Sequence, residues 1–525
     1  MALLDAEETN APSAVPSLEA VPDSSPDRPG RPGRTWSWTG RRSWGLPALP
    51  PLANRLTAPL ALAGLVALVV IWLGVWSKQG IDFSVYWHGG KILNEAGPAA
   101  SGLYGPSVAW AGGPGLPFTY PPFAALFFGL LAQLPEKLAL NLFNTAGVLV
   151  ALWVAVRGVR YWSAKADWRR TFHSTGNRLA AALMVLAVLN LGPWRETLAF
   201  GQINILLMGL MAADLLARNP RWTRGFPGGG FLVGVAAGIK LTPLVFGLYF
   251  LMRKDWRGLL NMAAGFTSTV LAGFLLRPAE SLQFWLEILP DTSRIGGAGY
   301  VDNLSLKGAL LHFGVPAAAV TVPWLALSLL VVVLAAVIIK TASDQGARVV
   351  AISTTALTML LISPVSWSHH WVWVAAVLPA FAWTLRETPG RYPVTRWLMG
   401  GVLGISVLVF LFSPKTIGTA LGAENLDIQT PGLWIMASSA GVFCALAILV
   451  CWFVALRRGS LAPAFDLHGD SAPSKLWPAR TRGSAAGRRK AAAGSRRHHA
   501  EESILAPRGT GISVATSLDR VCGSS

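Results

Sequence analysis

The stretch SPVSWSHHW, residues 363–371, joins two apolar segments at 348–363 and 369–385. Polar and tryptophan side chains between apolar segments are typical of a turn at a membrane surface. Two adjacent histidines point in different directions from a helix, so His369 and His370 are not expected to hold a metal ion without other ligands. They are better suited to hydrogen-bond a phosphate or hydroxyl group. The neighbouring tryptophans either stack on a sugar or anchor the turn at the interface.

Apolar segments of this kind fill the middle of the chain. Of its 525 residues, 53% are hydrophobic and 13% are charged, and the mean hydropathy is +0.47. Soluble domains carry roughly 25% charged residues, so most of this surface must face lipid. We expect an all-α polytopic membrane protein with roughly 10–13 transmembrane or re-entrant helices and an active site on its outer loops. The apolar segments lie at 57–76, 121–134, 138–156, 179–191, 203–217, 229–252, 258–276, 316–339, 348–363, 369–385, 397–413 and 432–455.

The two ends of the chain differ from its middle. Residues 1–55 and 457–525 have the composition of disordered tails, and residues 56–456 form the expected membrane domain. The net charge of +18 comes mainly from basic residues in the tails and short loops. This distribution predicts a plasma-membrane protein with both termini in the cytoplasm. It favours contact between the basic C-terminal tail and anionic membrane lipid, and no nucleic-acid partner is expected.

The basic loops of the first half do not alternate across the membrane in a simple way. Loops at 157–178, 218–224 and 253–257 are all basic, and strict alternation would place two of them outside. Re-entrant half-helices at 179–217 and 229–252 would remove this conflict, because irregular backbone is tolerated at membrane depth where it lines a cavity.

A lysine interrupts the second of these segments. Lys240 has mostly apolar residues on both sides, and Leu-Thr-Pro follows it, which breaks the helix. A lysine near a helix end can extend its ammonium to the interface. A cation in the middle of an apolar run is costly, however, and usually marks a functional site.

Asp82 and Tyr86 are polar residues in the loop after the first apolar segment. They are four residues apart, so they share a face if the loop is helical. Asp82 is either an N-cap of that helix or a functional carboxylate facing the outside. Tyr120 belongs to an aromatic cluster at 118–123, which also fits an interfacial belt.

Three further polar groups lie close to apolar segments. Gln202 and Asn204 belong to a GQIN sequence between two short apolar segments, shortly after Arg195. Asn303 ends a long loop at 277–303 that we place outside the membrane. The three cysteines provide neither a disulfide framework nor metal-binding spacing.

Together these motifs resemble glycosyltransferase family 87, the actinobacterial polyprenol-phosphate-mannose-dependent mannosyltransferases. The resemblance covers residues 56–456, and SPVSWSHH is its most specific part; the aspartate and the KLTP break occur across GT-C enzymes generally. The motifs, in chain order, are Asp82 with Tyr86, Leu103-Tyr104, residues 118–122, GQIN at 201–204, GIKLTP at 238–243, NLSL at 303–306 and residues 363–371.

This resemblance implies a GT-C fold and transfer of a sugar from a lipid phosphate on the extracytoplasmic side. By position, Asp82 would be the catalytic base. Members of the family extend phosphatidylinositol mannosides, lipomannan and lipoarabinomannan, so a glycolipid acceptor and an alpha-(1-2) linkage are expected. A related branch transfers arabinofuranose instead of mannose. The expected substrate- or phosphate-binding residues are Tyr86, Tyr120, Arg195, Gln202, Asn204, Lys240, Asn303, His369 and His370.

The chemistry leads to the same expectations. The acceptor hydroxyl needs a base, and cations or hydrogen-bond donors stabilise the departing phosphate. A single carboxylate with direct displacement inverts the anomeric centre, whereas retention needs a second carboxylate close by. No DxD-type pair occurs in an outer loop, so we expect neither a metal nor another cofactor. A lipid-linked sugar flippase would also use broken helices, but its usual internal repeat is missing from the hydropathy pattern.

Overall fold

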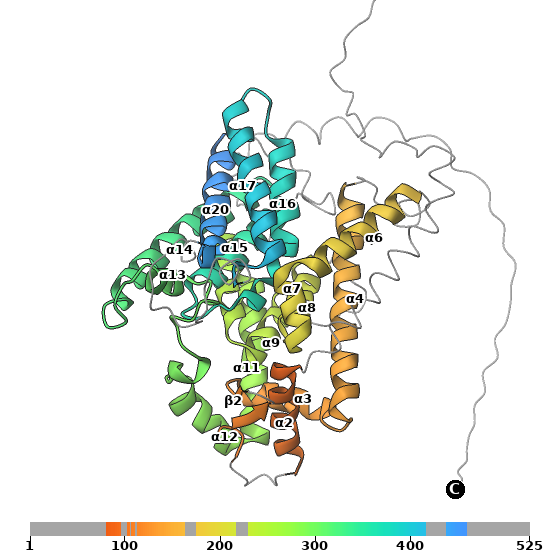
Figure 1. Ribbon diagram of the computed structural model, residues 1–525, viewed down its shortest axis with the longest axis vertical. Helices are drawn as coiled ribbons and strands as arrows, with labels where there is room; N and C mark the ends of the chain where they lie inside the picture. Colours follow the sequence, from red (N-terminus) through yellow and green to blue (C-terminus); the bar gives the residue numbers. More distant parts are fainter. Residues whose placement is uncertain are drawn as a thin grey trace, which may run out of the picture. The chain divides into compact units, whose positions relative to one another are not determined.

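The computed structural model describes residues 80–95, 102–105, 107–110, 113–162, 175–216, 229–415 and 437–458 (Figure 1). The chain divides into two compact units, Met1–Gly469 and Asp470–Ser525, and all described residues belong to the first. The apolar segment at 57–76 and the two tails expected at 1–55 and 457–525 lie outside the described residues, apart from the first two positions of the second tail. The three-part domain organisation therefore stays a prediction.

Long apolar helices confirm that this is an all-α, multi-pass membrane protein. Each is long enough to cross a bilayer, and their leucines and valines face outward instead of packing inside the protein. In α14, for example, Leu329 and Leu330 are 65% and 64% exposed. Such exposure of apolar side chains is unfavourable in water but not in lipid. The five long helices are α4 (Glu136–Trp162), α11 (Trp256–Leu276), α14 (Thr321–Asp344), α17 (Pro393–Phe412) and α20 (Ala440–Arg457).

Shorter apolar helices lie between the long ones. They span Pro122–Leu131, Ala181–Asn190, Thr242–Met252 and Arg348–Ile362. Together with the five long helices and a bent pair, they represent most of the apolar segments predicted within the described ranges. Within the residues that the structure describes, length and composition alone support five spans, or six if the bent pair is one span. Both five and six are below the predicted 10–13 helices, because that prediction also included re-entrant helices.

The bent pair lies at the first predicted break. Helices α7 (Gly192–Phe200) and α8 (Asn204–Leu216) meet at an angle of 116°. Gly201 forms the bend with a φ of +68°, and a Cβ there would lie 2.5 Å from the Cβ of Phe83. Only glycine fits both conditions. The bend confirms the broken segment expected at 179–217, in which α6 (Thr175–Asn190) comes first.

The second predicted break lies at Lys240. Helix α9 (Phe231–Ile239) ends there because Lys240 is extended, with φ of −147° and ψ of 124°. A 3₁₀ turn, η2 (Thr242–Phe246), then leads into α10 (Gly247–Met252). Pro243 lies in the first turn of η2, where its missing N–H is not needed. The chain therefore changes direction at the lysine, as the sequence predicts.

The outer-loop residues fold into short elements around these breaks. Helix α2 (Ile81–Glu95) packs on α3 (Pro122–Leu131), whose first residue is a proline, a favourable residue for the first turn of a helix. A small antiparallel hairpin, β1 (Ser107–Trp110) and β2 (Gly113–Pro117), lies next to α2 (Figure 1). The remaining elements are α12 (Pro278–Gln283), η3 (Phe284–Ile288), η4 (Thr292–Ile295), α13 (Leu306–His312), α15 (Arg348–Ile362), η5 (Ser368–Trp373) and α16 (Val374–Glu387).

Helices α9 and α11 pack unusually closely because glycines form their contact. A Cβ on Gly234 would lie 2.0 Å from the carbonyl oxygen of Met262, and one on Gly265 would lie 2.1 Å from that of Phe231. Backbone therefore touches backbone across this interface, as small residues permit between membrane helices. This close packing fixes the end of α9, and with it Lys240.

We predict that Gly234→Ala lowers the stability of the protein by about 1–3 kcal/mol, because a methyl group forces the two helices apart. Gly404→Ala in α17 is the matched control, since no atom lies within 4 Å of a Cβ at that position. Thermal unfolding of the purified protein in detergent should show a lower transition temperature for Gly234→Ala alone. Equal transition temperatures for the two variants would contradict the close packing.

Candidate functional site

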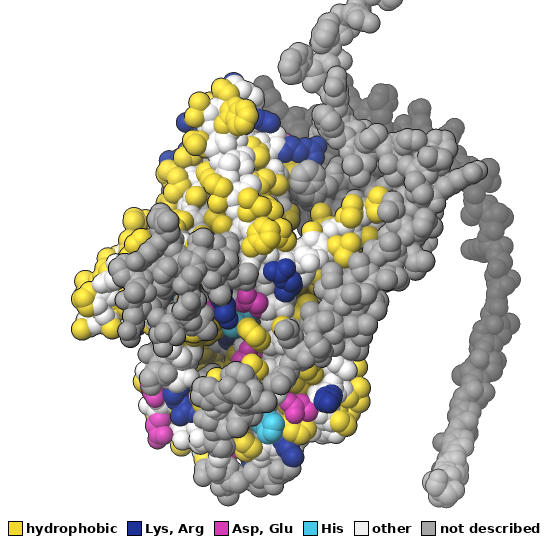
Figure 2. Space-filling view, in the orientation of Figure 1, with side chains coloured by type: hydrophobic (Ala, Val, Ile, Leu, Met, Phe, Trp, Pro, Cys, Tyr) yellow, Lys and Arg dark blue, Asp and Glu magenta, His cyan; other side chains and the backbone are white. Residues whose placement is uncertain are grey.

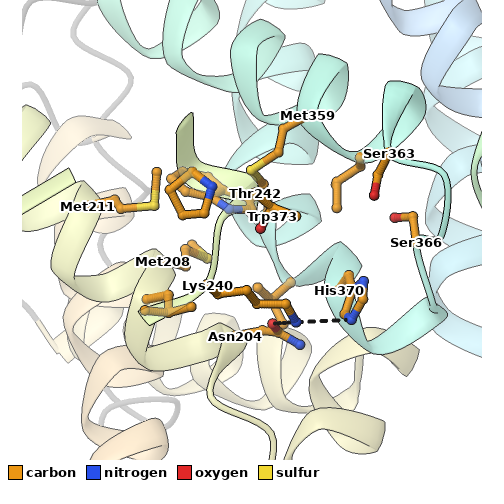
Figure 3. A pocket seen from close by; sticks show the side chains of 14 residues that line it. Asn204, Met208, Met211, Lys240, Thr242, Met359, Ser363, Ser366, His370 and Trp373 are labelled. Carbon is orange, nitrogen blue, oxygen red and sulfur yellow. Dashed lines mark hydrogen bonds between the residues drawn. The ribbon is translucent and has the colours of Figure 1, made fainter. Parts of the chain in front are cut away.

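The Lys240 ammonium is the centre of a polar cluster between the broken helices. Its Nζ donates to Asn204 Oδ1 at 3.0 Å and lies 3.1 Å from His370 Nε2 (Figure 3). It also lies 5.6 Å from the centre of the Tyr120 ring, within range of a cation–π interaction. Each partner comes from a different segment of the chain. The structure therefore brings together four of the residues that the sequence singled out: Lys240, Asn204, Tyr120 and His370.

The imidazole of His370 is suited to accept from this ammonium. Burial, followed by the charge of Lys240, holds the pKa of His370 well below its usual range. The ring is therefore neutral near pH 7. Its Nε2 can accept a hydrogen bond from the Lys240 ammonium, and the positive charge stays on the lysine. An anionic ligand that reaches this position meets a full positive charge.

A small cavity opens beside Lys240 and His370. Apart from these two residues and Asn204, its polar lining is limited to a few hydroxyl groups (Figure 3). The rest of the wall is apolar, and in Figure 3 Met208 and Met211 belong to α8 and Met359 to α15. Flexible, polarizable methionines suit an apolar ligand of irregular shape. The cavity therefore combines one cationic end with an apolar wall.

Asp82 lies next to this cluster, in the first turn of α2. Gln202 hydrogen-bonds the carboxylate, and Lys240 interacts with it electrostatically. Burial raises the pKa of Asp82 to about 6, although Gln202 and Lys240 oppose the shift. The helix begins at Ile81, so Asp82 lies within the helix and not at its N-cap. Its bond to Gln202 favours the functional interpretation over the capping one.

Two tyrosines hold Gln202 in position. Tyr86 donates its hydroxyl proton to Gln202 Oε1 at 2.7 Å, and the Tyr120 hydroxyl lies 2.8 Å from that of Tyr86. Tyr86 is itself fully buried and stacks on Phe128, with 4.4 Å between ring centres. With its oxygen occupied by Tyr86, the Gln202 amide directs its N–H groups toward Asp82. A rigid chain of hydrogen bonds therefore orients the carboxylate.

The backbone of the SPVSWSHHW stretch is fastened to the bent pair. The carbonyl oxygen of His369 accepts from Thr197 Oγ1 at 2.8 Å and from Asn204 Nδ2 at 3.0 Å. Trp194 Nε1 donates to the carbonyl oxygen of Val372 at 2.9 Å. Asn204 therefore holds Lys240 with its Oδ1 and the histidine segment, residues 363–371, with its Nδ2.

The two histidines face different surroundings. Their rings are perpendicular, with 4.7 Å between centres, and only His370 contacts Lys240. One potential ligand atom each from His369, Glu196 and Asp302 lies within 4.8 Å of the other two. Burial, followed by the charge of Glu196, raises the pKa of Asp302 to about 7. Of the two histidines expected to bind a phosphate or hydroxyl group, only His370 lies against Lys240 and lines the cavity, and their roles stay predictions.

Two other predicted site residues lie outside the cluster. Asn303 is fully buried, and its Nδ2 donates to the carbonyl oxygens of Ala298 and Pro364. Its Oδ1 accepts from two backbone N–H groups, including that of Ser366 at 2.9 Å. Asn303 therefore fastens the loop before α13 to the histidine segment instead of presenting a group to substrate. Arg195 donates to the carbonyl oxygen of Leu411 at 2.9 Å, at the end of α17.

Sequence reasoning missed Glu196 and Asp302. Glu196 follows Arg195 and Asp302 precedes Asn303, two of the predicted binding residues. Each is also an acidic residue in a chain with few charges. That signal was available, but 106 positions separate the two in sequence, so nothing in their spacing showed that they meet. Figure 2 shows acidic, basic and histidine side chains gathered between α17 and α2, on a face where apolar side chains otherwise predominate.

The model of glycosyltransferase family 87 matches residues 118–364. A polyprenol-phosphate-mannose-dependent alpha-(1-2)-phosphatidylinositol mannoside mannosyltransferase of Mycolicibacterium smegmatis is 38% identical over 352 residues, which cover 63% of this chain and 75% of that protein. The chain belongs to glycosyltransferase family 87. The family resemblance that the motifs indicated is therefore confirmed.

Other relatives of this family 87 chain carry similar names. The Mycobacterium tuberculosis protein with the same name is 34% identical over 331 residues, covering 61% of this chain and 73% of its own. A pentamannoside-specific mannosyltransferase of Mycolicibacterium smegmatis is 30% identical and covers 72% of this chain and 86% of its own. The structure of ArnT from Cupriavidus metallidurans bound to undecaprenyl phosphate covers 77% of both chains, with 15% identity and a TM-score of 0.32.

Proposed function

We propose that this family 87 chain transfers mannose from polyprenyl-phosphate mannose to a glycolipid acceptor, with inversion and an alpha-(1-2) linkage. The acceptor class is a phosphatidylinositol mannoside, lipomannan or lipoarabinomannan, and the reaction takes place on the outer face of the plasma membrane. The observation that carries this proposal is the Lys240 ammonium, held by Asn204 and His370 at a break between membrane helices and close to Asp82. The names of the relatives support the donor and the linkage.

The donor phosphate binds at Lys240. A phosphate oxygen accepts charge-assisted hydrogen bonds, which are roughly twice as strong as neutral ones. The side chain of Asn204 and the imidazole of His370 hold the ammonium at this position. The first isoprene units lie against the apolar wall that includes Met208 and Met211 (Figure 3). This arrangement fits a ligand with an anionic head and an apolar tail.

Asp82 acts as the base. Its pKa of about 6 leaves the carboxylate ionised at pH 7, yet basic enough to take the proton of an acceptor hydroxyl. Gln202 orients the carboxylate and is itself fixed by Tyr86. As the new glycosidic bond forms on one face of the sugar, the bond to the phosphate breaks on the other. Direct displacement of this kind converts a β-linked donor into an α-linked product.

Lys240 stabilises the leaving group. When the bond from sugar to phosphate breaks, the phosphate gains negative charge. A preorganised ammonium in a largely apolar cavity interacts with this charge more strongly than it would in water. The same lysine therefore serves in donor binding and in the chemical step, while Asp82 acts on the acceptor.

The positions of the basic residues support a cytoplasmic location for one end of α14, α17 and α20. Lys340 and Arg457, at the ends of α14 and α20, line one surface hollow. Arg458 donates to Thr395 at the start of α17. Basic helix ends gather on the cytoplasmic side of membrane proteins. This end would therefore be cytoplasmic, together with the C-terminus, which follows α20.

We predict that Asp82→Asn reduces mannosyl transfer at least about 100-fold, because the amide cannot accept the acceptor proton. Asp344→Asn is the matched control, since Asp344 pairs with Lys340 on the exposed surface of α14. The measurement is incorporation of radiolabelled mannose from polyprenyl-phosphate mannose into lipid-linked acceptor, with linkage analysis of the product. Near-normal transfer by Asp82→Asn would remove Asp82 as the base. Movement of the intact donor across the membrane without a new glycosidic bond would indicate a flippase instead.

The pKa of Asp82 predicts how the transfer rate depends on pH. The base is active when ionised, so the rate should rise with pH through about 6 to a plateau near 7. Above about 8 the rate should fall again, because burial lowers the pKa of Lys240 to about 8 and the lysine loses its charge there. At pH 5 it should be about tenfold below the plateau, because one pH unit below a pKa leaves about a tenth of the carboxylate ionised. Gln202→Leu should move the midpoint upward, because the hydrogen bond from Gln202 lowers this pKa. An unshifted midpoint in that variant would show that a different group controls the profile.

A further inference from the structure

A second polar cluster lies behind the donor-phosphate site, built from α7, the loop before α13 and η5. One ligand atom each of Glu196, Asp302 and His369 lies within 4.8 Å of the others. Asp302 and His369 are only 4% and 6% exposed. These residues are far apart in sequence, so the fold alone brings them together. The transfer reaction proposed above uses none of them.

Part of this cluster lacks the hydrogen bonds that burial demands. Among the residues that the structure describes, Asp302 Oδ1 and both ring nitrogens of His369 have no hydrogen-bond partner. Buried polar atoms are almost always paired, and leaving one unpaired costs about 1–3 kcal/mol. The two nitrogens of an imidazole point in different directions, so one His369 nitrogen faces the carboxylates; this nitrogen and Asp302 Oδ1 indicate a missing ligand between the side chains. A ligand that accepts electron pairs would satisfy both a carboxylate oxygen and the lone-pair nitrogen of a neutral imidazole.

We propose that Glu196, Asp302 and His369 bind a divalent transition-metal ion of the Mn²⁺ or Zn²⁺ type. Two carboxylates and one imidazole are the ligands these ions share. Ligand atoms about 2.1 Å from one ion lie at most about 4.2 Å apart, so the observed separations need only small side-chain rotations. The sequence predicted no metal, because no DxD-type pair occurs in an outer loop and the adjacent His369 and His370 point in different directions.

The hydrogen bonds around the cluster fit this assignment. Ser368 Oγ lies within hydrogen-bonding distance of Glu196 and, at 3.0 Å, of Asp302 Oδ2, and its single proton can go to either carboxylate; Ser413 Oγ donates to Glu196 Oε1 at 3.0 Å. These outer bonds orient both carboxylates and leave Asp302 Oδ1 available, as is usual around metal ligands. Lys415 adds a positive charge that interacts with both carboxylates. The ion would tie α7, the loop before α13 and η5 together, and so hold the adjacent His370 against Lys240.

The test begins with the wild-type protein, purified in lipid nanodiscs, stripped with a chelator and dialysed. Titration with Mn²⁺ or Zn²⁺ alone, followed by elemental analysis and by the Mn²⁺ paramagnetic resonance signal, should give about one tightly bound ion per chain. The ion should also raise the unfolding temperature. A stripped wild-type protein that binds neither ion, with an unfolding temperature unaffected by metal, overturns the proposal. Lys415 and a proton shared by the two carboxylates would then account for the cluster.

Near-isosteric variants locate the ion. Asp302→Asn and His369→Gln should bind it at least about tenfold more weakly, the loss that even outer-shell changes cause. His370→Gln is the matched control and should retain the ion, because the His370 ring contacts Lys240 instead. Asp82→Asn should also retain the ion while losing transfer, which separates a failure here from a failure of the proposed reaction. Wild-type affinity in both Asp302→Asn and His369→Gln would also overturn the assignment.

Discussion

A positive charge in an apolar segment is the constraint on which the rest of the site depends. An isolated ammonium at membrane depth is so costly that the structure must surround it with acceptors. The chain meets this need for Lys240 with Asn204 Oδ1, His370 Nε2 and the face of Tyr120. Each of these partners comes from a different part of the chain, so pairing the lysine arranges α3, α8, α9 and η5 around one point. The same charge then provides the binding energy for an anionic lipid head.

The irregular backbone around this point is stabilised by side chains. The histidine segment has few regular hydrogen bonds of its own, and Thr197, Asn204 and Trp194 satisfy its carbonyl groups. Asn303 does the same for the loop before α13: its Nδ2 donates to the carbonyl oxygen of Ala298, and its Oδ1 accepts from the backbone N–H of Ser366. Non-helical backbone is tolerated at membrane depth only under this condition. The polar residues near the site therefore divide into those that face the cavity and those that hold its walls.

This division explains how far the sequence could predict the structure. Local signals were sufficient for the breaks, because the glycine at 201 and the Lys-Leu-Thr-Pro sequence each interrupt a helix for a physical reason that is visible in a few residues. Asn303, like Asn204, is a polar residue close to an apolar segment, and only the contacts in the structure show that it fastens a loop. The cluster of Glu196, Asp302 and His369 could not be predicted, because its members meet through the tertiary fold. The helix count was equally hard to predict, since short apolar segments do not reveal whether they cross the membrane.

The central claim is that the Lys240 ammonium binds the phosphate of a polyprenyl-phosphate donor. The most direct measurement is the affinity of polyprenyl phosphate for the protein in nanodiscs, compared between the wild type and Lys240→Met. Lys340→Met is the control, because that lysine is exposed and pairs with Asp344, one turn further along α14. Loss of a hydrogen bond to a charged group should weaken binding by about tenfold or more in Lys240→Met alone. Equal affinity in the wild type and in a folded Lys240→Met variant would contradict the account.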